Sequence, residues 1–262
     1  MARSPVESAA GTDDTAAAAR AARLELERLL DSAPALRDSL PAGYADAAER
    51  YVRLLLEANR RLNLTRVTDG PDVALRHLLD ALSALPLLDE AGADRAIDIG
   101  SGGGVPAIPL ALARPEMAWV MVDSTRKKAA ALEEFVAALR LDRAGVVAER
   151  AEVLGRDPAH RERYAVATAR ACAALPVLAE LALPLVRVGG TLIAWKGPLA
   201  ADDPEISGGR GAAGQVGGGR PRIREAGLAA LGGHTLVLIG KERPTEARFP
   251  RRPGEPGRRP LG

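Results

Sequence analysis

Residues 95–110 read RAIDIGSGGGVPAIPL, a stretch in which a short apolar run meets a glycine cluster and then a helical pattern. The apolar residues Ala96, Ile97 and Ile99 suit a buried parallel strand. The four glycines that follow allow backbone angles and a close ligand approach that side chains would block. The stretch therefore predicts a strand, a tight turn on which a small molecule rests, and a helix that begins near Pro106.

Two classes of cofactor bind a loop of this kind, namely dinucleotides and S-adenosylmethionine. The spacing Gly100-x-Gly102-x-Gly104 fits S-adenosylmethionine better, although Gly102, Gly104 and Ala107 formally satisfy the dinucleotide fingerprint. Pyrophosphate binds the free N–H groups of a helix N-terminus, and Pro106 removes one of them. We therefore favour S-adenosylmethionine, with a nucleotide-dependent oxidoreductase as the alternative.

The composition is that of a soluble globular protein, with 262 residues, 47% hydrophobic content and a formal net charge of +2. This charge is too small to indicate nucleic-acid binding by itself. The single cysteine, Cys172, excludes an intrachain disulfide, and the three histidines are widely separated, so we expect no metal site. Because no secretory signal and no apolar run of ~18 residues is present, we expect a cytoplasmic protein with no membrane contact.

We divide the chain into four parts. Residues 1–22 are expected to be a disordered lead, and residues 23–90 a helical cap, because apolar residues recur at helical spacing over 23–40, 44–62 and 73–88. Residues 91–241 form the main domain, with an insertion at about 198–222 that is too glycine-rich for a helix. Residues 242–262 are basic and proline-rich, and we expect an extended arm whose arginines neutralise phosphates.

Strand and helix patterns alternate after the glycine loop. Strands are predicted at 118–122, 145–149, 164–168 and 190–195, and helices at 125–141 and 175–186. This alternation predicts a parallel, doubly wound α/β sheet. Asp123 ends the second strand about 20 residues past the loop, where a carboxylate would accept hydrogen bonds from ribose hydroxyls. Its alternative role is to cap the helix that follows.

Further motifs are spread along the chain. They are DIGSGGGVPAIPLA at 98–111, VDS at 122–124, RAE at 150–152, TARA at 168–171 and WKG at 195–197, together with NLT at 63–65, HLLD at 77–80, TLVLI at 235–239 and FPRRPG at 249–254. From about Tyr44 to the C-terminus, this set resembles the bacterial glucose-inhibited division protein B family. Members of that family are 16S ribosomal RNA guanine N7-methyltransferases.

The resemblance implies a class I S-adenosylmethionine-dependent methyltransferase, a Rossmann-like fold whose seven-stranded, mostly parallel sheet has an antiparallel last strand at 234–240. It also implies site residues. The cofactor-binding set is Gly100, Gly102, Gly104, Val105, Asp123 at the ribose, Ala151 and Glu152 beside the adenine, and Arg170 at the cofactor edge facing the substrate. The sequence departs from the family at Gly103, Val105 and Ala107, which bears on cofactor affinity.

The target atom determines the expected mechanism. Guanine N7 has an available lone pair, so it attacks the methyl group in line without a general base, and catalysis rests on positioning. Guanine O6 and N7 are hydrogen-bond acceptors, which makes Arg170, Lys196 and His77 candidates for positioning the substrate. Alternatively, Arg170 pairs with a carboxylate, Lys196 is solvated, and His77 bonds a neighbour on a helix surface.

The expected substrate is the 530-loop region of 16S rRNA, near the decoding centre of the small ribosomal subunit, and we expect a monomer. A methyltransferase for another RNA or a small molecule, and a catalytically inactive RNA-binding protein, are the alternatives. RNA cytosine C5 methylation would need a thiolate nucleophile. We interpret Cys172 instead as a buried packing residue, because its apolar neighbours raise the pKa of a thiol.

Overall fold

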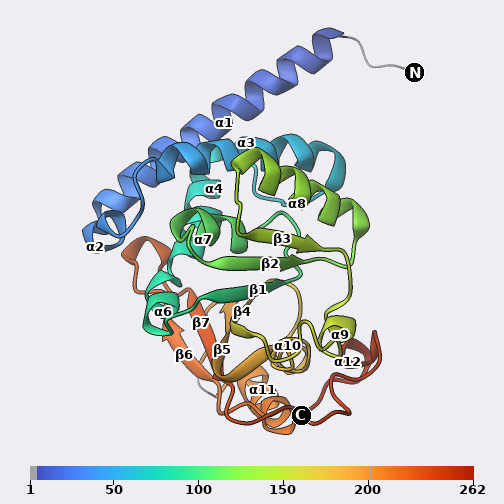
Figure 1. Cartoon of the computed structure of the whole chain (residues 1–262). Helices are drawn as coiled ribbons and strands as arrows, with labels where there is room; N and C mark the ends of the chain where they lie inside the picture. The colour runs from blue at the N-terminus through green and yellow to red at the C-terminus, as the bar shows by residue number, and fades with distance from the viewer. Residues whose placement is uncertain (1–4, 201) are drawn as a thin grey trace.

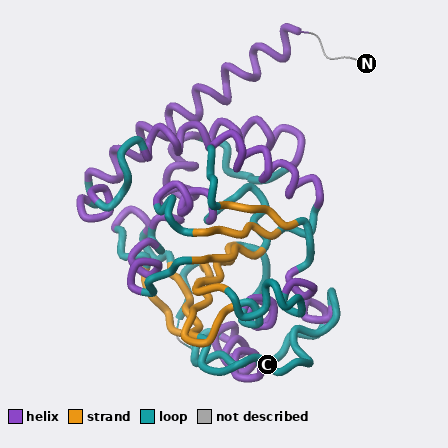
Figure 2. The backbone as a smooth tube through the Cα atoms, in the orientation of Figure 1, coloured by secondary structure: helices purple, strands orange, loops and turns teal. Residues whose placement is uncertain are grey.

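The computed structural model describes residues 5–200 and 202–262, with side chains from residue 14 onward. A seven-stranded sheet lies between helical layers (Figures 1 and 2). Its strands are β1 (Arg95–Ile99), β2 (Ala118–Val122), β3 (Ala144–Val147), β4 (Tyr164–Arg170), β5 (Val186–Lys196), β6 (Arg222–Glu225) and β7 (Thr235–Gly240). The predicted positions of the parallel strands agree with these bounds to within four residues.

The strand order is β3-β2-β1-β4-β5-β7-β6. Strands β1 to β5 pair in parallel, whereas β7 runs antiparallel to both β5 and β6. This topology confirms the predicted class I methyltransferase fold. The chain winds outward from β1 to β3 and then returns to β4 on the other side of β1. Ligands of such sheets bind beyond the carboxyl ends of the strands at this reversal, so the site is expected between the ends of β1 and β4.

Helices cover both faces of the sheet. In Figure 1, α7 (Ala107–Ala113), α8 (Arg126–Leu139), α3 (Tyr44–Leu62) and α1 (Pro5–Asp31) lie on one side of the sheet, and α10 (Leu175–Ala182) and α11 (Pro204–Gln215) lie on the other. The shorter elements are α2 (Pro34–Asp38), α4 (Gly70–Val73), the π-helical turn η1 (Ala74–Leu79), α5 (Asp80–Leu82), α6 (Leu85–Glu90), α9 (Ala151–Leu154), η2 (Ala229–Leu231) and α12 (Glu255–Arg258). Because β1 and β4 are covered on both faces, nearly every residue of these strands is buried.

Part of the predicted disordered lead is helical. Residues 1–4 lie outside the described residues, but α1 begins at Pro5, and Ala19 and Ala22 are buried. The physical reason is a close helix contact, because a Cβ on Gly70 would lie 2.8 Å from the Cβ of Ala21. Small side chains on α1 therefore let the start of α4 approach, and the prediction of disorder is wrong for residues 14–22.

The glycine-rich insertion also contains a helix, contrary to the prediction. Asp203 caps α11 by accepting a hydrogen bond from the backbone N–H of Glu205 at 2.8 Å, and Pro204 opens the helix. A Cβ on Gly209 would collide with the side chain of Leu175 on α10. The glycine therefore allows close packing of two helices, which stabilises α11 despite its low intrinsic helix propensity.

The C-terminal segment is packed against the body and is not the predicted extended arm. Phe249 is buried and cannot stack on a base. The guanidinium of Arg161 donates hydrogen bonds to the carbonyls of Gly155 and Phe249, at 2.6 and 2.8 Å. Arg251 donates from its backbone N–H and from Nε to the fully buried carboxylate of Glu180, each at 2.8 Å. Within the described residues, no helix is long and apolar enough to cross a membrane.

Removing the positive charge of Arg251 should destabilise the fold, because Glu180 would then be a buried charge without a partner. We expect Arg251→Met to lower the free energy of unfolding by ~3 kcal/mol, measured by urea denaturation. The matched control is Arg252→Met at the exposed neighbouring position, for which a change within ~0.5 kcal/mol is expected. Equal losses in the two variants would show that the buried pair does not anchor the C-terminal segment.

Candidate functional site

The glycine loop lies between the end of β1 and the start of α7. The backbone N–H groups of Gly100 and Ser101 both donate to the carbonyl of Val122, at 2.9 and 3.0 Å, which holds the loop at the carboxyl ends of β1 and β2. Gly100, Gly102 and Gly104 all have positive φ angles, of 71°, 54° and 92°. These conformations explain why glycine occupies the three positions.

The surroundings of the glycines differ. A Cβ on Gly100 would lie 2.9 Å from the Cβ of Cys172, and one on Gly103 would lie 2.7 Å from Cδ1 of Leu55. At Gly102, the nearest atom would be the carbonyl oxygen of Gly100 at 3.8 Å. Gly102 is therefore the position at which the loop backbone faces open space, and a ligand can approach it there.

Asp123 connects the loop to the next helix. Its carboxylate accepts hydrogen bonds from the backbone N–H of Gly102 at 3.0 Å and from that of Thr125 at 2.8 Å. Each carboxylate oxygen has a further lone pair, which suits the hydroxyl donors of a ribose. Both roles considered for Asp123 are thus geometrically compatible, because its carboxylate binds the backbone just before α8 and lies beside the open position at Gly102.

Asp98, in the middle of β1, is a site residue to which the sequence analysis gave no role. Its side chain is fully buried, and Oδ1 accepts a hydrogen bond from the Thr168 hydroxyl at 2.6 Å. Oδ2 is buried and has no hydrogen-bond partner. Burial raises the pKa of the Asp98 carboxyl to about 6. An acid within an apolar strand was the signal in the sequence, and its free acceptor suits a ligand with a donor group.

Arg170, at the end of β4, is held by residues of the cap. Its Nε lies 3.6 Å from Oδ2 of Asp80, and its Nη2 lies 3.3 Å from Nδ1 of His77. The carboxylate pairing that was considered for Arg170 is therefore present. Nη1, in contrast, is buried and has no hydrogen-bond partner. The arginine thus retains one donor for a ligand.

The geometry defines the tautomer of His77. An arginine only donates hydrogen bonds, so Nδ1 of His77 accepts and the ring proton is on Nε2, which donates to the Thr65 hydroxyl at 2.7 Å. Burial, reinforced by the charge of Arg170, lowers the pKa of His77 to about 4. His77 is therefore neutral at pH 7, and both of its ring nitrogens are occupied.

Asp80 is the centre of this network. Its Oδ1 lies 3.2 Å from Nδ1 of His234, and its backbone carbonyl accepts a hydrogen bond from the Trp195 indole at 2.8 Å. His77 lies in the π-helical turn η1, and Asp80 follows directly after it. Such turns change the direction of side chains and are frequent at functional sites. The sequence analysis quoted Asp80 and Thr65 within motifs but gave them no role.

The other predicted residues lie nearby with different partners. Lys196 donates to the Glu205 carboxylate at 2.6 Å and to the Ala173 carbonyl at 3.0 Å, so it is not the solvated side chain that was considered. Ala151 and Glu152 are buried at the start of α9, and the Glu152 carboxylate accepts the Gly254 N–H at 2.7 Å. Val105 is half-buried at the end of the glycine loop.

Cys172 does not match its predicted role as a buried packing residue, because it is exposed in the loop after β4. The preceding residue, Ala171, has a φ of 52°, an uncommon conformation for a residue with a side chain. Desolvation by the surrounding protein raises the pKa of the Cys172 thiol to about 12. A thiol of this kind is protonated at pH 7, which argues against a nucleophilic role.

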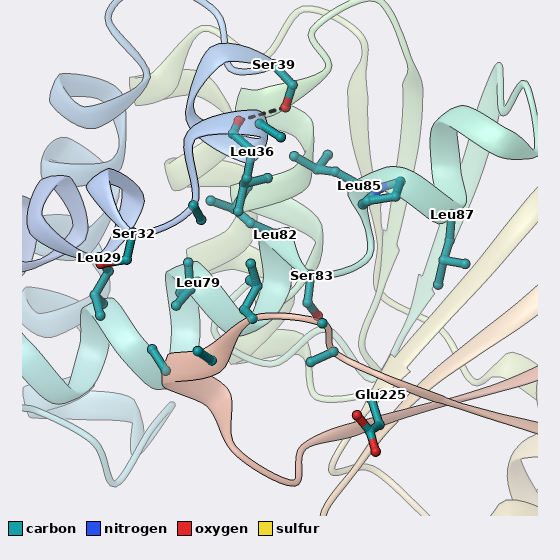
Figure 3. A pocket seen from close by; sticks show the side chains of 18 of the residues that line it. Leu29, Ser32, Leu36, Ser39, Leu79, Leu82, Ser83, Leu85, Leu87 and Glu225 are labelled. Carbon is teal, nitrogen blue, oxygen red and sulfur yellow. Dashed lines mark hydrogen bonds between the residues drawn. The ribbon is translucent and has the colours of Figure 1, made fainter.

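A separate cleft of about 660 Å³ lies at the edge of the cap, away from the glycine loop (Figure 3). Leucines dominate its lining, among them Leu36, Leu79 and Leu85. None of the predicted site residues lines it. Within the part of the chain that is described, no group of three or more His, Cys, Asp or Glu residues could hold a metal ion.

We expect Asp98→Asn to stabilise the protein at neutral pH. The folded-state pKa of about 6 exceeds the ordinary value of 3.8, so the folded state binds the proton more tightly, and stability falls as pH rises from ~4 to ~6. The full penalty, ~3 kcal/mol, applies above pH 6. Urea unfolding should show a gain of ~2 kcal/mol for the variant at pH 7.5 and of at most ~1 kcal/mol at pH 4.5, where the folded protein still keeps Asp98 protonated.

The control for this experiment is Asp142→Asn, which changes an exposed carboxylate and should behave like the wild type. Asp98→Asn removes the carboxylate whose Oδ2 is the free acceptor. We therefore also expect Asp98→Asn to bind the cofactor ~10-fold more weakly in calorimetric titration. If Asp98→Asn were less stable than the wild type at pH 7.5, this would contradict the interpretation that burial of the charged Asp98 carboxylate destabilises the folded protein.

Comparison with known proteins adds a family match. Residues 45–208 match the family described as rRNA small subunit methyltransferase G. The ribosomal RNA small subunit methyltransferase G of Deinococcus radiodurans is 43% identical over 86% of this chain and 89% of that protein. The protein of the same name from Roseiflexus castenholzii is 45% identical over 81% of this chain and 89% of its own length.

The solved structures that resemble this fold are more distant in sequence. Cofactor-bound Rv0187 from MTB superposes with a TM-score of 0.50 and is 18% identical, covering 74% of this chain and 91% of that one. The CurJ carbon methyltransferase superposes with a TM-score of 0.50 at 16% identity, over 83% of this chain and 70% of that one. At this distance the similarity supports the fold alone.

Proposed function

The chain belongs to the rRNA small subunit methyltransferase G family, and on that premise we propose that it transfers a methyl group from S-adenosylmethionine to N7 of a guanine in 16S rRNA. It is thus an S-adenosylmethionine-dependent rRNA methyltransferase with a class I fold. The proposed target is a guanine in the 530-loop region, near the decoding centre of the small ribosomal subunit.

The residues around the glycine loop fit S-adenosylmethionine, which supplies an electrophilic methyl group when it is bound. Gly102 leaves room for a ligand against the loop backbone. Asp123 presents a carboxylate next to that position, and Oδ2 of Asp98 is a buried acceptor without a partner. Acceptors suit a cofactor with ribose hydroxyls and a methionine ammonium group as donors. In the proposed arrangement these three residues hold the cofactor.

The unpartnered Nη1 of Arg170 is the observation that carries the proposal for guanine. Guanine presents O6 and N7 as acceptors on one edge, and a donor that binds O6 leaves the lone pair of N7 free. Arg170 is fixed by Asp80 and His77, so its remaining donor has a defined direction. A fixed donor of this kind orients the base, which is the main requirement of the reaction.

The state of His77 is also consistent with N7 as the target. A nucleophile that loses no proton needs no general base. His77 is neutral with both ring nitrogens occupied, so it is a structural partner of Arg170 and not a free base. The chain's own residues then have three tasks, which are to bind the cofactor, to orient the guanine and to exclude water.

Methyl transfer from labelled S-adenosylmethionine tests the proposed function. The acceptors are small ribosomal subunits and 16S rRNA from cells that lack this protein. We expect incorporation of about one methyl group per particle, and chemical cleavage at 7-methylguanine should map to one position in the 530-loop region. Incorporation at another atom or in another RNA would overturn the N7 assignment, and no incorporation despite cofactor binding would point to a different methyl acceptor.

Arg170 and Asp80 should act as a unit in that assay. We expect Arg170→Gln to lower the kcat/KM of methyl transfer by ~100-fold, with cofactor affinity changed by less than ~3-fold, because a donor to the base is lost. Asp80→Asn should lower kcat/KM by ~10-fold alone and have little further effect in the Arg170→Gln background. Additive effects would show that Asp80 does not act through Arg170. Arg143→Gln, at an exposed arginine before β3, is the matched control.

A further inference from the structure

Six cationic side chains flank the glycine loop from two directions. Arg60 and Arg61 lie in the last turn of α3, and Arg66 follows in the connector after that helix. On the other side, Arg126, Lys127 and Lys128 form the first turn of α8. We call this set the flanking cations. Figure 1 shows the C-terminal end of α3 and the N-terminal end of α8 on the same side of the molecule, to which β2 and β3 point.

Hydrogen bonds and packing contacts connect both segments to the glycine loop. The connector is held to α3 by the hydrogen bond from the Thr65 backbone N–H to the Asn59 side chain, at 2.8 Å, and Leu64 packs beside Gly103. On the opposite side, the Asp123 carboxylate binds the N–H groups of Gly102 and Thr125 and so fixes the start of α8 beside the loop. The two groups therefore belong to segments that contact the glycine loop at Gly103 and at Gly102.

The flanking cations have no anionic partner within the described residues. Five of the six are exposed and Lys128 is half-buried. None of them forms an ion pair, although nearby arginines do, as Arg53 does with Glu57 and Arg76 does with Asp72. Their charge is therefore available to an external anion.

The three cations on α8 lie at the end of the helix where positive charge is electrostatically unfavourable. A helix N-terminus carries a partial positive charge, so cations in the first turn are unfavourable. The first turn of α8 contains three cations and no acidic residue. These side chains do not stabilise the helix that carries them, so helix stability does not account for their position.

The C-terminal segment, which the sequence analysis expected to contact phosphates, is less suited to that role. Arg251 pairs with the buried Glu180, Arg248 pairs with Glu246, and Arg243 donates to the Gly214 carbonyl. Arg243 and Arg251 thus hold the segment to the body and Arg248 pairs within it, which leaves only part of the segment's charge for an external anion.

We propose that the flanking cations bind the phosphodiester backbone of RNA on both sides of the base that enters the site. This inference rests on the proposed function for the identity of the RNA. Phosphate contacts fix the position of the nucleic acid and carry no sequence information, whereas Arg170 contacts the base. Two separate cationic groups hold a strand at two points, which positions the nucleotide between them.

Two triple variants of the full chain test the proposal. The first combines Arg60→Gln, Arg61→Gln and Arg66→Gln. The second combines Arg126→Gln, Lys127→Gln and Lys128→Gln. The control triple is Arg210→Gln, Arg220→Gln and Arg222→Gln, which removes three exposed arginines without ion pairs from α11, the loop after it and the start of β6. The readout is filter binding to 16S rRNA from cells lacking the protein, without cofactor, over a series of salt concentrations.

Each test triple should bind RNA ~10-fold more weakly at low salt, and the slope of log affinity against log salt should fall in magnitude by about 2, since each single-strand phosphate contact contributes ~0.7. The control triple should match the wild type, and calorimetric affinity for S-adenosylmethionine should stay within ~2-fold in all variants. Wild-type binding by the test triples, or an equal loss in the control, would overturn the proposal.

The same variants separate this inference from the proposed function. One outcome is that the test triples lose salt-dependent RNA binding while the wild type transfers no methyl group. This outcome would support RNA binding by the flanking cations and refute the proposed activity. The other outcome is that the wild type transfers methyl groups while the test triples keep their RNA affinity. This outcome would support the proposed activity and refute RNA binding by the flanking cations.

Discussion

A half-buried guanidinium is the constraint on which the site depends. Arg170 ends a central strand where little water reaches it, and a charge in such a place requires compensation. The cap supplies it through the Asp80 carboxylate and the accepting nitrogen of His77. The same carboxylate lies 3.2 Å from Nδ1 of His234, just before β7, so Asp80 joins the N-terminal helices both to β4 and to the segment that leads into β7. The cap is accordingly part of the site, not an appendage to it.

Local patterns in the sequence predicted the elements whose stability is local. The strongly amphipathic α3 has the predicted bounds, 44–62, and the alternation of strands and helices gave the sheet topology. The predictions that failed depend on distant contacts. Composition indicated disorder over residues 1–22, no helix in the glycine-rich insertion and an extended arm over residues 242–262. Helix α1, helix α11 and the C-terminal segment are each ordered by a partner far away in sequence, such as Leu175 against Gly209 or Glu180 against Arg251.

For the candidate site, too, local patterns in the sequence predicted some residues and missed those whose partners are distant in the chain. Glycine spacing and the position of Asp123 predicted a cofactor loop, and the structure joins the two through the hydrogen bond from Gly102 to Asp123. The family match confirms the resemblance that the motifs suggested. Asp80 could not be assigned, because its partner Arg170 lies on β4, about ninety residues away in the chain, and only the fold brings them together. Thr65 reaches Arg170 only indirectly, through its hydrogen bond to His77. Gly103, a departure from the family pattern, faces Leu55 of the cap, so its effect falls on the packing of α3 and not on the open face of the loop.

The contacts of residues 251–254 bear on how the chain folds as it is made. Glu180 is fully buried and Glu152 nearly so, and their partners, Arg251 and Gly254, follow them in the chain by 71 and 102 residues. The strands of the sheet are therefore synthesised before Arg251, and until then the Glu180 carboxylate has no cation to bind. The sheet can assemble at that stage, but it reaches its final stability only when Arg251 is available. A chain cut before residue 251 would keep every strand and leave an unpaired buried charge.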